Sequence, residues 1–166
     1  LIKSSGIIIE GEFNDGEFLN KGKIVFEDKT NFQGTIEDLE IGNRGILTYP
    51  NGNKFEGQFY DGRPQGFGIF TSKTGDKYEG KFEEGNKNGN GREYLAQTQE
   101  YYEGIYERGQ RNGEGKLLTN KGELYDTIYL RGELKSRSSM PIRIPINMYM
   151  KQVAKFLEER PIVEPK

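Results

Sequence analysis

Residues 55–77 read FEGQFYDGRPQGFGIFTSKTGDK, a stretch rich in both glycine and aromatic residues. It holds five glycines, four phenylalanines and one tyrosine. Glycine at this density is typical of a flexible linker or a phosphate-binding loop, but neither needs so many aromatic residues. The Gly-x-Gly pair of this stretch is not followed by Lys-Ser or Lys-Thr and opens no helix, so the sequence does not favour a nucleotide-binding loop. The rest of the chain shows what the glycines are for.

The stretch is one copy of a repeat that runs along most of the chain. An aromatic residue or Ile, followed two residues later by Gly in all but the last copy, recurs at spacings of 23, 23, 23, 24 and 23 residues. The copies start at Ile9, Phe32, Phe55, Tyr78, Tyr102 and Tyr125. Four residues after each start stands a second large residue, in the order Phe13, Ile36, Phe59, Phe82, Tyr106 and Tyr129. This agreement predicts a repeat architecture. Because residues 5–9 align with residues 51–55, we expect residues 1–8 to end an earlier repeat, with further repeats upstream in the intact protein.

Each copy is predicted to be a β-hairpin. Residues 55–59 alternate large and polar side chains, which is typical of a strand with one covered face. Asp61-Gly62 and its equivalents then supply a tight turn, and a second strand follows from Gly68. Because a lone hairpin is at best marginally stable, the copies must stack into an all-β, elongated solenoid. This solenoid would be a single twisted antiparallel sheet, roughly 60 Å long at ~4.8 Å per strand. Its glycine columns would leave room for large rings to lie against the backbone.

Composition narrows the classes of function. The chain has 166 residues, a net charge of −2 and neither cysteine nor histidine. Thiolate nucleophiles, the commonest general base and the commonest transition-metal ligand are therefore missing, and we expect no enzyme activity, catalytic residue, metal or cofactor. A nucleic-acid binder would usually carry a surplus of basic residues, so the net negative charge disfavours nucleic acid as a partner. No apolar run approaches the roughly 18 residues that a membrane-spanning helix needs.

The repeat resembles the MORN (membrane occupation and recognition nexus) motif. The resemblance is carried by Tyr78-Glu79-Gly80-Lys81-Phe82 with Gly89-Asn90-Gly91, and by residues 102–106 with Gly113 and Gly115. It covers about residues 9–132. The chain departs from the motif in having no Trp, and the copy at residues 32–54 has Leu39 and Glu40 where a glycine turn belongs.

The resemblance implies a non-enzymatic scaffold or adaptor. Its repeat surface would bind another protein within a larger intracellular assembly, cytoskeletal or membrane-associated, in the cytoplasm. Self-association is a further option. The alternatives are a phospholipid-binding module and an accessory domain of an enzyme encoded outside this chain. We assign the repeat array to residues 1–135 and a linker with a helix to residues 136–166.

The segment after the repeats is predicted to hold one amphipathic helix at residues 147–160, capped by Asn147 and stopped by Pro161. Its apolar face is expected to dock either on the open end of the array or on another protein, with membrane-surface insertion as a third option. This predicted docking face comprises Tyr149, Met150, Val153, Phe156 and Leu157.

Two columns of side chains are candidate site residues. The later repeats use tyrosines where the earlier ones use Phe and Ile, and tyrosine is enriched at protein interfaces. We therefore predict a partner-binding groove formed by Tyr78, Tyr102, Tyr106, Tyr125 and Tyr129. Replacing Tyr102 and Tyr125 by Ala is then expected to weaken binding and leave the fold intact. The second column is nearly all acidic (Glu10, Gln33, Glu56, Glu79, Glu103, Asp126). It is interpreted as a solvated face neutralised by cations such as Lys81 or Arg92, in preference to a calcium or acid–base site.

Overall fold

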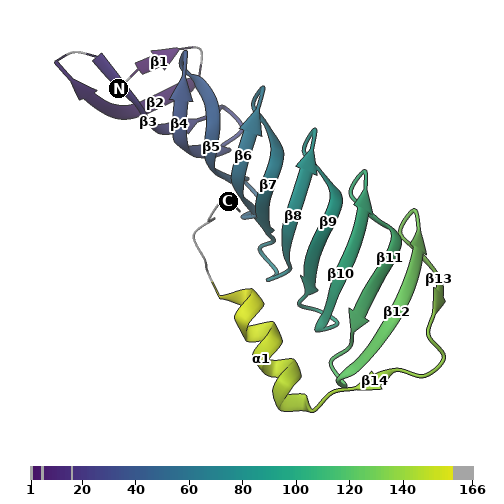
Figure 1. Ribbon diagram of the computed structural model, residues 1–166. Helices are drawn as coiled ribbons and strands as arrows, with labels where there is room; N and C mark the ends of the chain where they lie inside the picture. Colours follow the sequence, from purple (N-terminus) through teal and green to yellow (C-terminus); the bar gives the residue numbers. More distant parts are fainter. Residues whose placement is uncertain (1, 5, 16, 159–166) are drawn as a thin grey trace.

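The computed structural model describes residues 2–4, 6–15 and 17–158. The chain forms one antiparallel sheet in which the strands follow one another in sequence order from β1 to β13, with β14 paired to β12 (Figure 1). The early strands are β1 (Ile2–Ser4), β2 (Ile7–Asn14), β3 (Glu17–Val25), β4 (Asn31–Glu37), β5 (Glu40–Thr48), β6 (Lys54–Tyr60) and β7 (Arg63–Thr71). The later strands are β8 (Lys77–Glu83), β9 (Asn86–Leu95), β10 (Glu100–Glu107), β11 (Gln110–Leu118), β12 (Glu123–Leu130), β13 (Glu133–Arg137) and β14 (Ile142–Arg143). One helix, α1 (Ile146–Leu157), follows. The predicted all-β, elongated sheet with a C-terminal helix is confirmed.

Each repeat is a hairpin. In the five copies from residue 32 onward, both residues of the two-residue turn have positive φ, the geometry that matches the twist of the flanking strands. Asp61 and Gly62 have φ values of 48° and 69°. The copy at residues 32–54 makes the same turn without glycine, because Asp38 and Leu39 adopt φ values of 50° and 67°. This copy therefore keeps the hairpin fold at the cost of backbone strain at Leu39.

Replacing Leu39 by Gly is expected to raise the free energy of unfolding by about 1 kcal/mol, because a left-handed conformation is unfavourable for Leu and not for Gly. Urea titration monitored by circular dichroism measures the change. Leu39→Ala serves as the control, since it removes the half-exposed side chain but keeps the Cβ that causes the strain. A gain of equal size in both variants would show that the side chain, not the backbone, is responsible.

A bulge in the first strand of each hairpin bends the strand around its aromatic residues. The pairing register shifts between Gly57 and Phe59, and again between Gly80 and Phe82. Residues four apart in a flat strand would lie about 13 Å from each other. The ring centroids of Phe55 and Phe59 are only 5.1 Å apart. The bend thus turns the two aromatic columns toward each other and buries them on one face of the sheet, the aromatic face.

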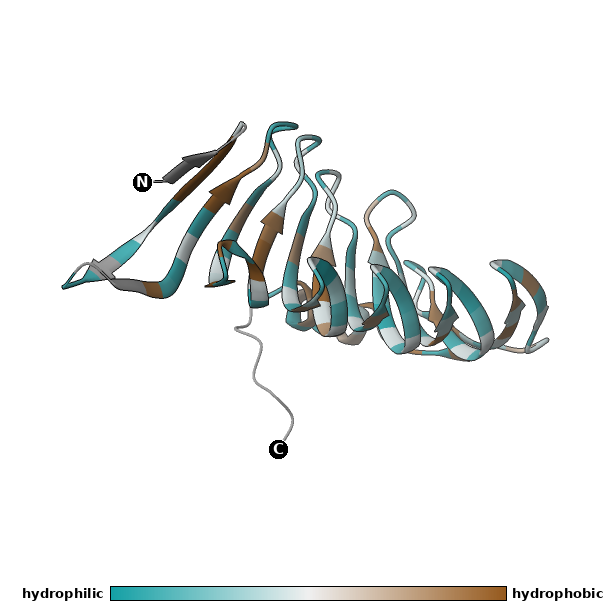
Figure 2. Cartoon of the chain, turned by 90° about the horizontal axis from the view of Figure 1, so that it is seen from above, coloured by the Kyte–Doolittle hydropathy of each residue, from teal (hydrophilic) through white to brown (hydrophobic). Residues whose placement is uncertain are grey.

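From the copy at residue 32 onward, the buried rings form a continuous chain of edge-to-face contacts that links one repeat to the next. Successive ring centroids are 4.8–5.8 Å apart in the order Phe32, Phe59, Phe55, Phe82, Tyr78, Tyr106, Tyr102 and Tyr129. Each such pair contributes roughly 0.5–1.5 kcal/mol beyond the burial of its area. In Figure 2 the hydrophobic segments recur from strand to strand along the array. The core is therefore a ribbon that runs the length of the sheet.

The glycines make room for these rings, as predicted. A Cβ added at Gly68 would lie 2.4 Å from the Phe55 ring, and one at Gly91 would lie 2.3 Å from the Tyr78 hydroxyl. Both distances are far below van der Waals contact. Glycine at these positions is thus required by close approach of a ring to the backbone.

The helix differs from the prediction in its start and its position. It begins at Ile146 with Pro145 at the N-cap, so Asn147 lies inside the first turn and the predicted Asn147 cap is wrong. Residues 159–161, which include the predicted end and Pro161, lie outside the described residues. The helix does not cover the open end of the array. It packs on Tyr101 and Leu118, whose chain neighbours Tyr102 and Leu117 belong to the aromatic core, so the helix lies on the face opposite the aromatic columns.

Candidate functional site

The five tyrosines predicted to form a groove lie in the core. All are buried, and Tyr102 is 0% exposed. The expectation that Tyr102→Ala leaves the fold intact is therefore wrong, because the ring fills the centre of the aromatic chain. A direct contact between these tyrosines and a partner stays a prediction, and the open surface of the sheet lies elsewhere.

Two tyrosine hydroxyls of the later repeats are hydrogen-bonded to a network of charged side chains on the aromatic face. Arg111 Nη2 lies 2.9 Å from Glu93 Oε2, and Lys87 Nζ also donates to the Glu93 carboxylate. Tyr106 Oη donates to Glu93 Oε2 at 3.1 Å, and Arg111 Nη1 donates to Tyr129 Oη at 3.2 Å. Phenylalanine could make neither hydrogen bond. At Tyr106 and Tyr129 the use of Tyr in place of Phe or Ile therefore follows from this network.

Sequence reasoning missed this network, although the repeat contains its signal. Glu93 stands fifteen residues after the start of its copy, and it pairs in register with Tyr78. The equivalent residues of the other copies are apolar: Ile24, Leu47, Phe70 and Leu117. One carboxylate in an otherwise apolar column indicates a buried ion pair, since a buried charge needs a partner.

The network holds Glu93 ionised and the phenols neutral. Burial alone would raise the pKa of Glu93, but the charges of Lys87 and Arg111 outweigh burial and lower that pKa below its usual value. Burial, with Glu93 nearby, raises the pKa of Tyr106 far above its usual value. The arrangement is a satisfied structural cluster within the core.

The opposite face, the polar face, carries a row of alternating acids and bases. The strand register places Glu79 opposite Arg92, Arg92 opposite Glu103, and so on to Lys116 and Asp126. Arg92 Nη2 lies 2.9 Å from Glu79 Oε1, and Lys116 Nζ lies 2.6 Å from Asp126 Oδ1. The interpretation of the acidic column as a face neutralised by neighbouring cations is confirmed for these pairs. Among the described residues, no group of three or more acidic side chains could hold a metal ion.

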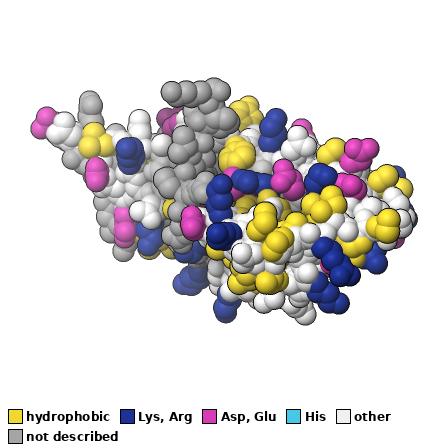
Figure 3. Space-filling model, turned by 60° about the horizontal axis from the view of Figure 1, so that its bottom comes forward, with side chains coloured by type: hydrophobic (Ala, Val, Ile, Leu, Met, Phe, Trp, Pro, Cys, Tyr) yellow, Lys and Arg dark blue, Asp and Glu magenta, His cyan; other side chains and the backbone are white. Residues whose placement is uncertain are grey.

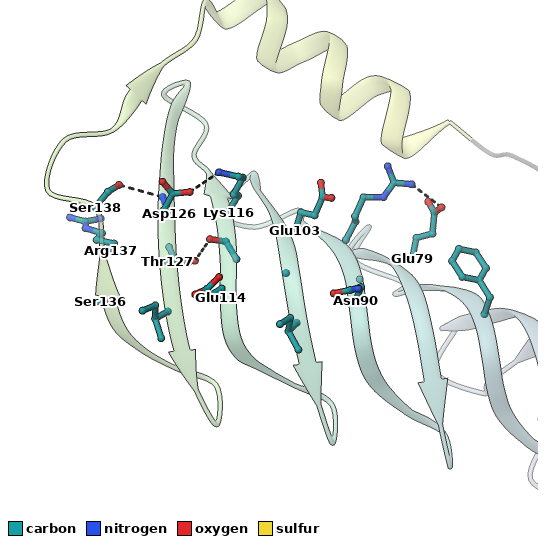
Figure 4. A pocket seen from close by; sticks show the side chains of 17 residues that line it. Glu79, Asn90, Glu103, Glu114, Lys116, Asp126, Thr127, Ser136, Arg137 and Ser138 are labelled. Atoms are coloured by element: carbon teal, nitrogen blue, oxygen red, sulfur yellow. Dashed lines mark hydrogen bonds and ion pairs between the residues drawn. The ribbon is translucent and has the colours of Figure 1, made fainter. Parts of the chain in front are cut away.

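A groove runs across the strands on the polar face, and we call it the glycine-floored groove (Figure 4). Its floor is the bare backbone of Gly91, Gly104 and Gly115, whose missing Cβ atoms would point into the rings of the other face. One wall is the charged row, and the other wall includes Ile105 and Ile128, which are 41% and 47% exposed. Ser136, Arg137 and Ser138 line its end at β13. A second stretch lies over the glycines of the early repeats, Gly11 to Gly57.

The repeat, the hairpins and the glycine positions agree with one known family. The MORN repeat model matches residues 10–30, 43–54, 55–77, 78–97 and 102–123, which is more than half of the chain. The chain belongs to the MORN repeat family. The match omits residues 31–42, where Leu39 replaces the turn glycine. No curated protein matches the chain in sequence. MORN repeats are consistent with a binding or membrane-associating module. Among the described residues, neither α1 nor any other segment forms a helix that could cross a membrane.

The helix of this MORN protein lies beside the groove and is anchored by three side chains. Tyr149, Val153 and Phe156 are buried against the sheet, whereas Met150 and Leu157 of the predicted docking face are 59% and 37% exposed. The Arg92 guanidinium, part of the groove wall, lies 5.5 Å from the centre of the Phe156 ring. Figure 3 shows hydrophobic side chains next to Lys and Arg on the underside of the molecule. Docking of the helix on another protein stays a prediction.

Lys77 attaches the C-terminal end of α1 to the MORN sheet. Its buried ammonium group donates to the carbonyl oxygens of Phe156 at 2.7 Å and Glu158 at 3.2 Å, where a helix carries partial negative charge. At the other end, Tyr149 Oη donates to the Gln99 carbonyl. The position of the helix is thus set by polar contacts at two points as well as by apolar packing.

Replacing Lys77 by Ala is expected to destabilise the docked helix by about 1–2 kcal/mol while the sheet stays folded, because a partly buried cation at a helix C-terminus contributes up to about 2 kcal/mol. Hydrogen exchange should show faster exchange in residues 146–157 and unchanged exchange in β4–β7. Lys54→Ala is the matched control, since Lys54 is exposed at the equivalent position one repeat earlier. Equal protection of α1 in both variants would contradict the attachment.

Proposed function

We propose that this MORN protein is a non-enzymatic scaffold that binds another protein through its glycine-floored groove, as part of a larger assembly. One observation carries the proposal. The tyrosine rings that were predicted to bind a partner are buried in the core. The opposite face has an open groove with exposed apolar residues on one wall. An exposed hollow lined by Ile105, Ile128 and charged side chains is the kind of surface that binds a protein segment.

The array supports such a function because its surface is rigid before a partner arrives. The strands are held by continuous backbone pairing from β1 to β13, and the repeats are joined by the chain of rings. A preformed groove loses little conformational entropy on binding. A long sheet can therefore hold a partner at a defined place within an assembly.

Phospholipid binding by the repeats is the second candidate, and the charge distribution argues against it for acidic lipids. Residues 1–135 carry a net charge of −5, and residues 136–166 carry +3. An acidic surface is repelled by an anionic membrane. Co-sedimentation with phosphatidylserine vesicles tests the alternative, and binding that survives removal of residues 136–166 would support it. A role as accessory domain of an enzyme is tested by the full-length reading frame.

The proposal is tested by cross-linking mass spectrometry on the native complex, followed by variants of the groove. Cross-links to the partner are expected from Lys116, which lines the groove, and from exposed Lys81, which pairs in register with the lining residue Phe67. The double variant Ile105→Arg with Ile128→Arg should weaken partner binding about tenfold or more, because it places charge on the apolar wall. Leu130→Arg is the matched control, since Leu130 is exposed on the same strand as Ile128 and does not line the groove. Equal binding by the two variants, with cross-links elsewhere, would refute the groove.

A further inference from the structure

The glycine-floored groove has a fixed period along its length. Glu79, Glu103 and Asp126 lie on β8, β10 and β12, so each is two strands from the next. Two strand spacings amount to about 9.6 Å. Ile105 and Ile128 on the opposite wall are also two strands apart. The charged row therefore offers an acidic contact every ~9.6 Å from β8 to β12, and the other wall offers an apolar contact at the same interval on β10 and β12.

A bound segment can use these contacts only if its own side chains recur at the same distance and in the same direction. In a polyproline II helix three residues advance about 9.3 Å and complete one turn, so every third side chain points the same way. In a β-strand three residues advance about 10 Å, but the third side chain points to the opposite face. In an α-helix a side chain points in the same direction again only after seven residues, which advance about 10.5 Å. The polyproline II helix fits the groove best in both spacing and direction.

The charges of the groove select the side chains of that segment. Glu79 and Asp126 are paired with Arg92 and Lys116, whereas exposed Glu103 between them makes no ion pair within the described residues. Glu114 on the other wall is also exposed and has no ion pair among the described residues. A cation entering the middle of the groove would meet these two carboxylates. The exposed Ile105 and Ile128 would contact an apolar side chain such as proline.

We infer that the groove of the later repeats binds a proline-rich basic segment in the polyproline II conformation, with Lys or Arg at every third residue. This inference rests on the proposed function and names the partner's chemistry. One row of its side chains meets the acidic column, where the middle cation faces Glu103, unpaired among the described residues, and its neighbours lie beside the paired Glu79 and Asp126. A second row meets Ile105 and Ile128, and the third row faces solvent. Seven residues, with cations at the first, fourth and seventh, cover the four strand spacings of about 19 Å from Glu79 to Asp126 at about 3.1 Å per residue.

The test uses a fluorescent peptide of four Lys-Pro-Ala triplets and measures its anisotropy with the whole protein. A second peptide has the same composition with its lysines placed at uneven spacings, and a third has Glu in place of Lys. The periodic peptide is expected to bind at least about fivefold more tightly than the uneven one, and the Glu peptide should not bind measurably. Glu103→Arg should weaken binding about tenfold, whereas Glu37→Arg, an equal change of charge at an exposed site outside the groove, should leave it unchanged.

Two results would overturn the inference. Equal binding of the even and uneven peptides would show general charge attraction without register, and absence of binding by the periodic peptide would show that the groove takes another ligand. Neither result decides the proposed function. If the Ile105→Arg and Ile128→Arg double variant still loses its native partner, the groove binds a protein of different chemistry. If it keeps that partner, the proposed function also fails.

Discussion

Replacing Tyr102 by Ala is expected to lower the free energy of unfolding by about 3–5 kcal/mol. The ring is 0% exposed, and its centroid lies 5.8 Å from that of Tyr106 and 5.4 Å from that of Tyr129. The Arg111 guanidinium lies 4.1 Å from the same ring centre. Because each repeat contacts only its neighbours, loss of this ring weakens the interface between two repeats and not a shared core. Urea titration of the whole chain measures the effect.

Tyr102→Phe provides the control for this prediction. The Tyr102 hydroxyl is buried and has no hydrogen-bond partner among the described residues. Removing it while keeping the ring should leave stability unchanged or raise it by up to about 1 kcal/mol. Two other copies already have Phe at the position equivalent to Tyr102, namely Phe32 and Phe55. If Tyr102→Phe were as damaging as Tyr102→Ala, the hydroxyl and not ring packing would be responsible.

Replacing Glu93 by Ala is expected to cost about 3 kcal/mol of stability, since removing one partner of a buried ion pair leaves its counter-charges unpaired. Lys87 and Arg111 would both remain in the core without a carboxylate. Urea titration at neutral pH gives the magnitude. The effect should exceed that of an exposed pair such as Lys116–Asp126, where Asp126→Ala is expected to cost under about 1 kcal/mol.

A variant that removes the whole network separates its charge from its packing. Lys87→Ile, Glu93→Leu and Arg111→Ile together copy the apolar residues of the repeat at 32–54, where Ile41 and Leu47 occupy these positions. Replacing all members of a buried ionic cluster by apolar residues is often neutral or stabilising. The triple variant should therefore lie within about 1 kcal/mol of the wild type or above it. Instability equal to that of Glu93→Ala would show that packing volume decides the site.

The same network predicts a pH dependence. The pKa of Glu93 in the folded chain is below its ordinary value of 4.5 because Lys87 and Arg111 outweigh the effect of burial. Its contribution to stability is thus fully present above the unfolded value and is lost as the pH falls through the folded pKa. Urea titrations at neutral pH and below pH 4 should show a larger loss on acidification for the wild type than for the triple variant. Identical losses would contradict the role of Glu93.

The turns, the register of the columns and the reason for the glycines could be predicted from the repeat. The conformation of a turn depends mainly on its own residues. The roles of the glycines in residues 55–77 follow from comparison with the five other copies, which have the same pattern. The Leu39 turn formed without glycine because the strands on both sides, and the repeats that flank them, hold it in place. Consistency between neighbours can thus impose a strained conformation on a single residue.

The position of the helix and the role of the tyrosines could not be predicted in this way. The apolar stripe of residues 149–157 predicts that one face of the helix is buried, but it does not identify the surface that covers it. The contact of Phe156 with Tyr101, at a ring-centroid distance of 5.3 Å, depends on which residues the sheet brings to that face. A tyrosine column is equally compatible with a core and with an open groove until the bend of each strand is known.

The hairpin, its period and the columns follow from the amino-acid sequence, because they depend on residues within one repeat and on neighbouring copies that share its pattern. Which face of the sheet is open follows only from the folded array. The bulge before residues such as Phe59 and Tyr106 bends the first strand of each hairpin so that both aromatic columns are enclosed. The same bend leaves the glycine backbone and the charged row accessible on the other side, and α1 covers part of that side. Burial is a property of the assembled sheet, and for this reason the surface available to a partner follows from the structure.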